Sequence, residues 1–319
     1  MQTELLNQIT ALVGSQFMSS ISNILSKYDI TRKTAPAPST NTQLLNSFLS
    51  AKKIEGKSPK TLAYYKNTLA KLLTATKKPI KQTTTDDLRN YLSEFQSVNG
   101  SSNVTIDNIR RILSSFFSWL EDEDFIVKSP VRRIHKVKTT KVVKETLSDE
   151  DLEKIRESAS SYRDRAIVEF LASTGVRAGE IVNLNINAIK LDDRSAVVLG
   201  KGNSEREVYF DARTKIHLER YLKTRTDKNE ALFVSNKIPN NRLTIGTIES
   251  IVKKIGEKSS VSHVHPHKFR RTLATRAIDK GMPVEQVQKL LGHVRIDTTM
   301  HYAMVNQTNV KISHRKYIG

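Results

Sequence analysis

Six polar side chains in the second half of the chain are of the types that phosphoryl transfer without a metal ion requires. Taken singly, each has a more ordinary explanation: arginine often pairs with glutamate, a lysine at a turn is usually solvated, and a lone tyrosine usually packs in a core. Together they can hold a phosphate, activate a hydroxyl nucleophile and protonate a leaving group. In chain order they are Arg177, Lys201, His267, Arg270, His293 and Tyr302.

Arginine, tyrosine and lysine can supply the main steps of such a reaction. Guanidinium groups hold both non-bridging oxygens of a phosphate and offset the charge of its transition state. A tyrosine hydroxyl has a pKa of about 10 and needs help to lose its proton before it attacks. A lysine can protonate the departing sugar oxygen if its surroundings lower its pKa. The set is therefore suited to breaking and remaking a phosphodiester bond.

Histidines alternate with other residues where a helix is expected to begin. His267 and Arg270 stand three residues apart, so both project to one face near the positive end of that helix, where a phosphate oxygen is stabilised. His263 and His265 come just before them, but Pro266 interrupts a regular strand and no nearby carboxylate completes a set of ligands. The pattern therefore does not predict a metal site.

The sequence around these residues resembles the four motifs of the tyrosine recombinases, also called phage integrases. The matching segments lie between residues 163 and 302 and read GVRAGEIVNL, GKGNSER, PHKFRRTLAT and LLGHVRIDTTMHYA. Four separate motifs in the order of the family make the resemblance specific, and no motif residue is missing. The departure is small: Arg271 follows Arg270 where many relatives carry histidine, which is expected to change DNA contacts more than chemistry.

The resemblance implies how the phosphate is bound and how the leaving group departs. Arg177 and Arg270 would clamp the scissile phosphate, and Glu180 would support the site without contacting the phosphate itself. Lys201, at the tip of a hairpin, would act as general acid on the 5′ oxygen.

The resemblance also implies the nucleophile and its partners. Tyr302 would attack the phosphorus and leave a 3′-phosphotyrosyl bond and a free 5′ hydroxyl. His267 would take the proton of the tyrosine, and His293 would hydrogen-bond the phosphate. Because the bond energy is kept in the covalent intermediate, no ATP and no other cofactor is expected.

The elements that must position these residues can be predicted in outline. Two segments alternate like the strands of a hairpin, residues 195–199 and 207–210, and the turn between them contains Lys201. Apolar spacing and capping residues predict helices around them. The expected helices span residues 149–158, 161–173, 267–280, 284–291 and 298–305.

The whole chain is expected to be mainly α with a small β-sheet (α+β) in the catalytic domain. Residues 1–38 are expected to form an amphipathic helical segment and a linker. Residues 39–129 are expected to form a helical bundle, which corresponds to the core-binding (SAM-like) DNA-binding domain of the family. Residues 130–144 are expected to form a basic linker that lies on the phosphates of the DNA backbone. Residues 145–319 are expected to form the catalytic domain with a C-terminal docking segment. The resemblance implies a C-shaped clamp of two domains around duplex DNA.

Composition points to a polyanionic partner. Among 319 residues, 52 Lys and Arg face 33 Asp and Glu, for a formal net charge of +19. Such a field attracts nucleic acid, and an anionic membrane surface or a ribosome is the alternative. There is no cysteine, which excludes disulfides, thiolate catalysis and Cys-based zinc sites. Neither a transmembrane helix nor a secretory signal is evident, so a cytoplasmic, nucleoid-associated protein is expected.

The expected activity is site-specific DNA recombination or integration, as used by a mobile element, in dimer resolution or in inversion. The resemblance implies that the protein acts on double-stranded DNA as a homotetramer on two DNA sites. A C-terminal segment, here residues 306–319, would dock on a neighbouring subunit. An accessory directionality factor is a further candidate partner. Two alternatives stay open at this point. A type IB topoisomerase-like enzyme shares a similar active site, and a non-catalytic DNA-binding regulator would explain the charge but not the six residues.

Overall fold

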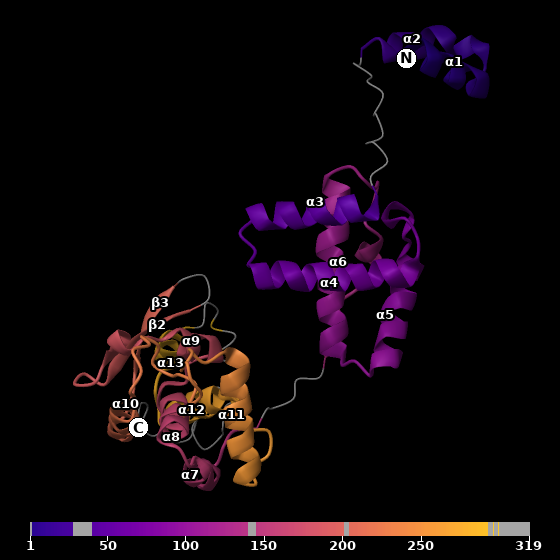
Figure 1. Ribbon diagram of the computed structural model, residues 1–319. Helices are drawn as coiled ribbons and strands as arrows, with labels where there is room; N and C mark the ends of the chain where they lie inside the picture. Colours follow the sequence, from indigo (N-terminus) through magenta and orange to yellow (C-terminus); the bar gives the residue numbers. More distant parts are fainter. Residues whose placement is uncertain are drawn as a thin grey trace, which may run out of the picture. The chain divides into compact units, whose positions relative to one another are not determined.

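The chain forms two compact units, Met1–Val142 and Val143–Gly319 (Figure 1). The computed structural model describes residues 2–27, 40–139, 145–200 and 204–292, together with Ile296 and Thr299.

The described part of the first unit is helical. Four of its helices begin at a Ser or Thr whose hydroxyl accepts the backbone N–H of the third residue along, which satisfies one donor of the first turn. These capping residues are Thr40, Ser58, Thr84 and Ser102. The helices are α1 (Gln2–Val13), α2 (Met18–Leu25), α3 (Asn41–Ile54), α4 (Pro59–Thr76), α5 (Thr85–Asn99) and α6 (Asn103–Asp122), with 3₁₀ turns at Ser15–Phe17, Ile80–Gln82 and Pro130–Arg133.

Helices α3 to α6 share one apolar core. Figure 1 shows α6 running across α3 and α4. Phe48 of α3 and Phe116 of α6 meet edge to face with their ring centroids 5.0 Å apart, and both are buried. Trp119, the single tryptophan of the chain, packs in the same cluster.

The chain after α6 stays on this bundle. Val131 is buried in the core, and Ile134 and Val137 pack against it. The buried carboxylate of Asp107 accepts the backbone N–H of Val137 at 3.2 Å, and Asn103 donates to the carbonyl of Lys138 at 3.0 Å. Residues 130–138, which the sequence predicted as linker, are therefore anchored to the first unit.

The second unit combines helices with a small sheet. Its helices are α7 (Asp149–Ser158), α8 (Tyr162–Thr174), α9 (Ala178–Asn183), α10 (Ala212–Lys223), α11 (Ile245–Lys258), α12 (Pro266–Asp279) and α13 (Val284–Leu291), with a 3₁₀ turn at Ile186–Ala188. Its antiparallel strands, in the order β1-β2-β3, are β1 (Ile189–Lys190), β2 (Ser195–Leu199) and β3 (Glu205–Tyr209).

Helix α8 lies at the centre of this unit and packs against α10 and α12. Its apolar side chains, such as Ile167 and Phe170, are fully buried. Glu169 is buried among them, where its carboxylate accepts hydrogen bonds from Arg156 at 3.0 Å and from Arg165 at 2.9 Å. A buried carboxylate needs such partners, because an uncompensated charge costs several kcal/mol.

The structure differs from the expected elements of the second unit at two strands and two helices. Strand β3 begins at Glu205, two residues earlier than predicted, because Leu199 pairs with Glu205 and the backbone N of Gly200 donates to the carbonyl of Ser204 at 2.7 Å. Strand β1 was not predicted, since two residues are too few for alternation to show. Helices α10 and α11 were not predicted either, although Asp211 and Thr244 cap them.

The helix expected over residues 298–305 lies outside the described residues, apart from Thr299. Its existence stays a prediction.

Asp107 offers a test of the anchored segment. Burial alone would raise the pKa of this carboxyl, but hydrogen bonds from Arg110 and the backbone of Val137 hold the pKa below its ordinary value. We expect Asp107→Asn to lower the free energy of unfolding of the first unit by about 2 kcal/mol, since hydrogen bonds to a charged group are lost. Urea unfolding followed by Trp119 fluorescence measures this unit alone, because the chain has no other tryptophan.

Glu94→Gln is the matched control, since Glu94 is an exposed carboxylate in the middle of α5. It should change the stability by less than about 0.5 kcal/mol. Equal urea midpoints for the two variants would show that Asp107 does not hold residues 130–138 on the bundle.

Candidate active site

Arg177 is placed by the tight connection between α8 and α9. Gly175 ends α8 in the left-handed region at φ 60°, where an added Cβ would lie 2.8 Å from Leu273 Cδ2. Two residues later Arg177 caps α9, and its backbone N–H donates to Oε2 of Glu180 at 2.8 Å. Its guanidinium Nη1 also donates to Glu180 Oε1 at 2.7 Å. One carboxylate therefore fixes both the backbone and the side chain of Arg177.

Glu180 is buried and is shared by two arginines. Besides Arg177, it accepts a bidentate pair from Arg206 of β3, with Nη1 to Oε1 at 2.6 Å and Nη2 to Oε2 at 2.7 Å. Burial alone would raise the pKa of Glu180, but the hydrogen bonds from Arg206 and Arg177 outweigh it and hold the pKa below its ordinary value. Glu180 is therefore an anion at neutral pH.

The carboxyl end of α13 is bound by three arginines. The last carbonyls of a helix lack partners within the helix and lie at the negative end of its dipole, so guanidinium donors stabilise them. Each of three successive carbonyls accepts from a different arginine. The bonds run from Arg206 Nε to Leu290 O (3.1 Å), from Arg270 Nη2 to Leu291 O, and from Arg177 Nη2 to Gly292 O (3.2 Å).

Helix α12 contributes Arg270 and His267. Pro266 starts this helix, where its fixed φ fits the first turn. Arg270 is only 2% exposed, and its Nη1 donates to the carbonyl of Gly175 at 2.7 Å. Arg177 and Arg270 are thus brought together, since they bind adjacent carbonyls of α13.

His267 lies in the first turn of α12 at the surface. Partial desolvation, and then the positive charges of Arg270, Arg177 and Arg271, lower the pKa of His267 below its ordinary value, while Glu249 acts weakly in the opposite direction. The imidazole is therefore neutral at neutral pH and able to accept a proton.

Three residues predicted for the site, Lys201, His293 and Tyr302, lie outside the described residues. Gly200 and Ser204, which flank the segment of Lys201, are joined by their backbones at 2.7 Å.

Arg206 was missed by the sequence analysis, which assigned it to the turn. A signal was present: Arg206 and Val208 stand two apart on one strand and so share a face, and Val208 is fully buried. An arginine on a buried face needs an acidic partner. The motif containing Glu180 could have supplied it.

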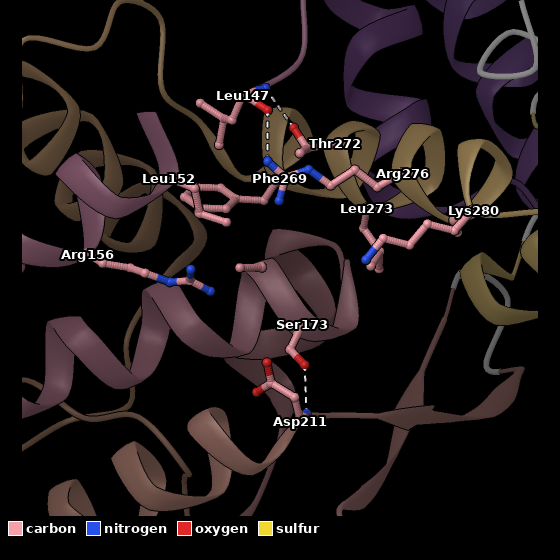
Figure 2. Close-up of a pocket in the computed structure, with 12 residues that line it drawn as sticks. Leu147, Leu152, Arg156, Ser173, Asp211, Phe269, Thr272, Leu273, Arg276 and Lys280 are labelled. Carbon is pink, nitrogen blue, oxygen red and sulfur yellow. Dashed lines mark hydrogen bonds between the residues drawn. The ribbon is translucent and has the colours of Figure 1, made fainter. Parts of the chain in front are cut away.

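A cavity of about 300 Å³ lies elsewhere in the second unit, among α7, α8 and α12 (Figure 2). Its lining includes Leu152, Phe269 and Arg276, and it is bordered by the hydrogen bond from the backbone N of Leu147 to Thr272 Oγ1, at 2.9 Å. None of the three described candidate residues lines it. The candidate site does not lie in this cavity: it combines the buried Arg270 with the half-buried Arg177 and the exposed His267.

Within the part of the chain that the structure describes, no group of three or more His, Cys, Asp or Glu side chains could hold a metal ion. In the same residues, no helix combines the length and the apolar character needed to cross a membrane.

Comparison with known proteins gives matches over both units. Residues 140–309 match the phage integrase family, and residues 44–126 match the phage integrase N-terminal SAM-like domain. Tyrosine recombinase XerC of Oceanobacillus iheyensis is 31% identical over 291 residues, which cover 85% of this chain and 94% of the relative. Tyrosine recombinase XerA of Pyrococcus horikoshii is 29% identical over 275 residues, or 85% of this chain and 92% of the relative.

Solved structures agree with these sequence matches. The crystal structure of XerA recombinase is 27% identical, with a TM-score of 0.50 over 87% of this chain and 98% of that chain. A lambda integrase (75–356) dimer bound to a COC′ core site has a TM-score of 0.68 at 21% identity, over 82% of this chain and 97% of that chain, which is a similarity of fold. The chain belongs to the phage integrase family and is a tyrosine recombinase, an enzyme that breaks and rejoins DNA strands.

Proposed function

We propose that this enzyme performs site-specific recombination through a 3′-phosphotyrosyl bond to Tyr302, without metal or ATP. In this proposal the remaining active-site residues are Arg177, Lys201, His267, Arg270 and His293. The observation that carries it is the convergence of two arginines at the end of α13, with a histidine on the same helix as one of them. Arg177 and Arg270 bind adjacent carbonyls there, and His267 lies one turn before Arg270 on α12.

The proposed cleavage step exchanges one bond to phosphorus for another. The Oη of Tyr302 bonds to phosphorus as the bond from phosphorus to the 5′ oxygen breaks. His267 takes the proton of Tyr302, and Lys201 gives a proton to the 5′ oxygen. Arg177 and Arg270 stabilise the charge that develops on the non-bridging oxygens. Attack by a 5′ hydroxyl of a partner strand reverses the step and releases the enzyme.

The arrangement of Arg177 supports its role as a phosphate clamp. Its side chain is 31% exposed, while its guanidinium is fixed by Glu180 on one side and by Gly292 O on the other. A pre-positioned planar guanidinium loses little freedom when it binds a phosphate, so more of the interaction energy remains for the transition state.

The first unit supports duplex DNA as the substrate. Along residues 130–138 the apolar side chains face the bundle, whereas Arg132, Arg133, Lys136 and Lys138 are exposed. A basic strip on a fixed backbone is suited to phosphate contacts. We therefore propose residues 39–129 as the core-binding domain, 130–144 as a basic segment on the DNA backbone and 145–319 as the catalytic domain.

The relatives suggest the assembly. One solved relative is a lambda integrase dimer on a core site, and another is XerH bound to a palindromic difH substrate. We propose by analogy a homotetramer on two DNA sites, with residues 306–319 docked on a neighbouring subunit and an accessory directionality factor as a further partner. Because its substrate is DNA, we propose a cytoplasmic, nucleoid-associated location.

The nucleophile can be tested by trapping. Wild-type protein incubated with DNA fragments from around its own gene should give a detergent-stable protein–DNA adduct, because the phosphotyrosyl bond is covalent. Tyr302→Phe should give none while binding the same fragments with equal affinity. Tyr162→Phe, at an exposed tyrosine of α8, is the matched control and should form the adduct normally. An adduct that persists in Tyr302→Phe would exclude Tyr302 as nucleophile.

The base can be tested by pH. The pKa of His267 is lowered from its ordinary value of 6.5, so the imidazole is neutral at neutral pH and becomes protonated only in more acidic solution. The rate of cleavage, measured with DNA in excess over the enzyme, should therefore fall as the pH drops below the ordinary pKa of histidine. His267→Gln should cleave about 100-fold more slowly and lose this acid limb. If the variant keeps the limb, another group is responsible for it.

A further inference from the structure

Arg206 connects the two parts of the site that hold Arg177. All three nitrogens of its guanidinium group donate hydrogen bonds: Nη1 and Nη2 bind the two oxygens of Glu180, and Nε binds the carbonyl of Leu290. The side chain is only 11% exposed. Because all of its guanidinium nitrogens donate hydrogen bonds and little of it is exposed, the side chain is held in one position.

The close fit of Arg206 extends to Gly292. This glycine caps α13 in the left-handed region, at φ 63°, and an added Cβ would lie 2.8 Å from Arg206 Cδ. The end of α13 therefore rests on Arg206. The carbonyl of the same Gly292 binds Arg177, so the position of Arg206 also determines where that acceptor lies.

Charge gives Arg206 a second effect on Arg177. If Glu180 had Arg177 as its single partner, the carboxylate would neutralise the guanidinium that must attract a phosphate. Arg206 supplies a second positive charge at 2.6 Å from Glu180 Oε1. The three groups together keep one net positive charge, and Arg177, at 31%, has the most exposed side chain of the three.

We propose that Arg206 is a positioning residue for strand cleavage: it holds Glu180 and the end of α13 so that Arg177 stays aimed and charged for the scissile phosphate. This inference rests on the proposed role of Arg177 as phosphate clamp. Arg206 itself does not touch the reacting atoms. It acts through the carboxylate and the helix end that together fix Arg177.

Lysine cannot replace Arg206 in this role. Its single ammonium can neutralise Glu180, but it lacks the planar fork that reaches both carboxylate oxygens and the carbonyl of Leu290 at once. Arg206→Lys therefore keeps the buried charge pair, and with it the fold, while releasing the end of α13. It is the variant that separates positioning from folding.

The experiment measures single-turnover cleavage at saturating DNA for Arg206→Lys, Arg206→Gln, Arg177→Gln and the double variant Arg177→Gln/Arg206→Lys, which keeps a cation beside Glu180. Arg206→Gln should cleave about 100-fold more slowly, the size of effect produced by small misplacement of a catalytic group. Arg206→Lys should lose at least about tenfold. The double variant should be no slower than Arg177→Gln, because Arg206 acts through Arg177. Multiplied losses in the double variant would overturn the proposal.

A substrate with an uncharged methylphosphonate at the scissile position provides the second readout. With this substrate the charge of Arg177 matters less, so the ratio of wild-type to Arg206→Gln rates should fall at least tenfold. A merely structural defect would slow both substrates equally, and an unchanged ratio would therefore overturn the proposal.

The controls separate this proposal from the proposed function. Arg220→Gln removes an exposed arginine of α10 and should leave both rates unchanged. If Arg177→Gln itself shows no substrate-dependent ratio, the clamp assignment of Arg177 fails. If Arg177→Gln shows the ratio and Arg206→Gln does not, the inference about Arg206 fails while the proposed function stands.

Discussion

Glu180 must be buried as an anion, and much of the site follows from that constraint. Moving a carboxylate out of water costs several kcal/mol unless positive charges and hydrogen bonds replace the lost hydration. Here the replacement comes from two elements, the start of α9 with Arg177 and strand β3 with Arg206. Loss of either arginine would leave the buried carboxylate with fewer hydrogen bonds and a single cationic partner. The sheet, α9 and the carboxylate therefore form one rigid block.

The same logic joins this block to α12 and α13. Two helices of the unit end at glycines in the left-handed region, Gly175 after α8 and Gly292 after α13. Their carbonyls accept from Arg270 and Arg177 respectively. Because each arginine binds the end of a helix that precedes a motif residue, the arginines serve both as structural caps and as proposed catalytic groups. Close packing at both glycines leaves no space for a side chain.

The sequence predicted the parts of this unit that local signals determine. Helices α7 and α13 begin and end as predicted, and α8 lies within one residue of its expected bounds. Helices α10 and α11 were missed although capping residues precede them. Arg206 was missed for a different reason: its partner stands 26 positions away in sequence, so no local periodicity links the two. Residues 130–138 were read by their charge, and the apolar face of that segment was overlooked. Lys201, His293 and Tyr302 remain sequence predictions, since they lie outside the described residues.

The choice of acceptors explains how the site can be both rigid and positive. A carboxylate holds an arginine but neutralises it, whereas a backbone carbonyl holds it and leaves its charge intact. Arg177, Arg206 and Arg270 all bind carbonyls of α13, and a single carboxylate, Glu180, is shared between two of them. The two guanidinium charges of Arg177 and Arg206 against the one carboxylate of Glu180 leave a net positive charge. Its effect is visible at His267, whose pKa is lowered in part by Arg270 and Arg177. A field of this kind attracts the phosphodiester and, together with the larger effect of desolvation, keeps the neighbouring base neutral, so it favours both requirements of the proposed cleavage step.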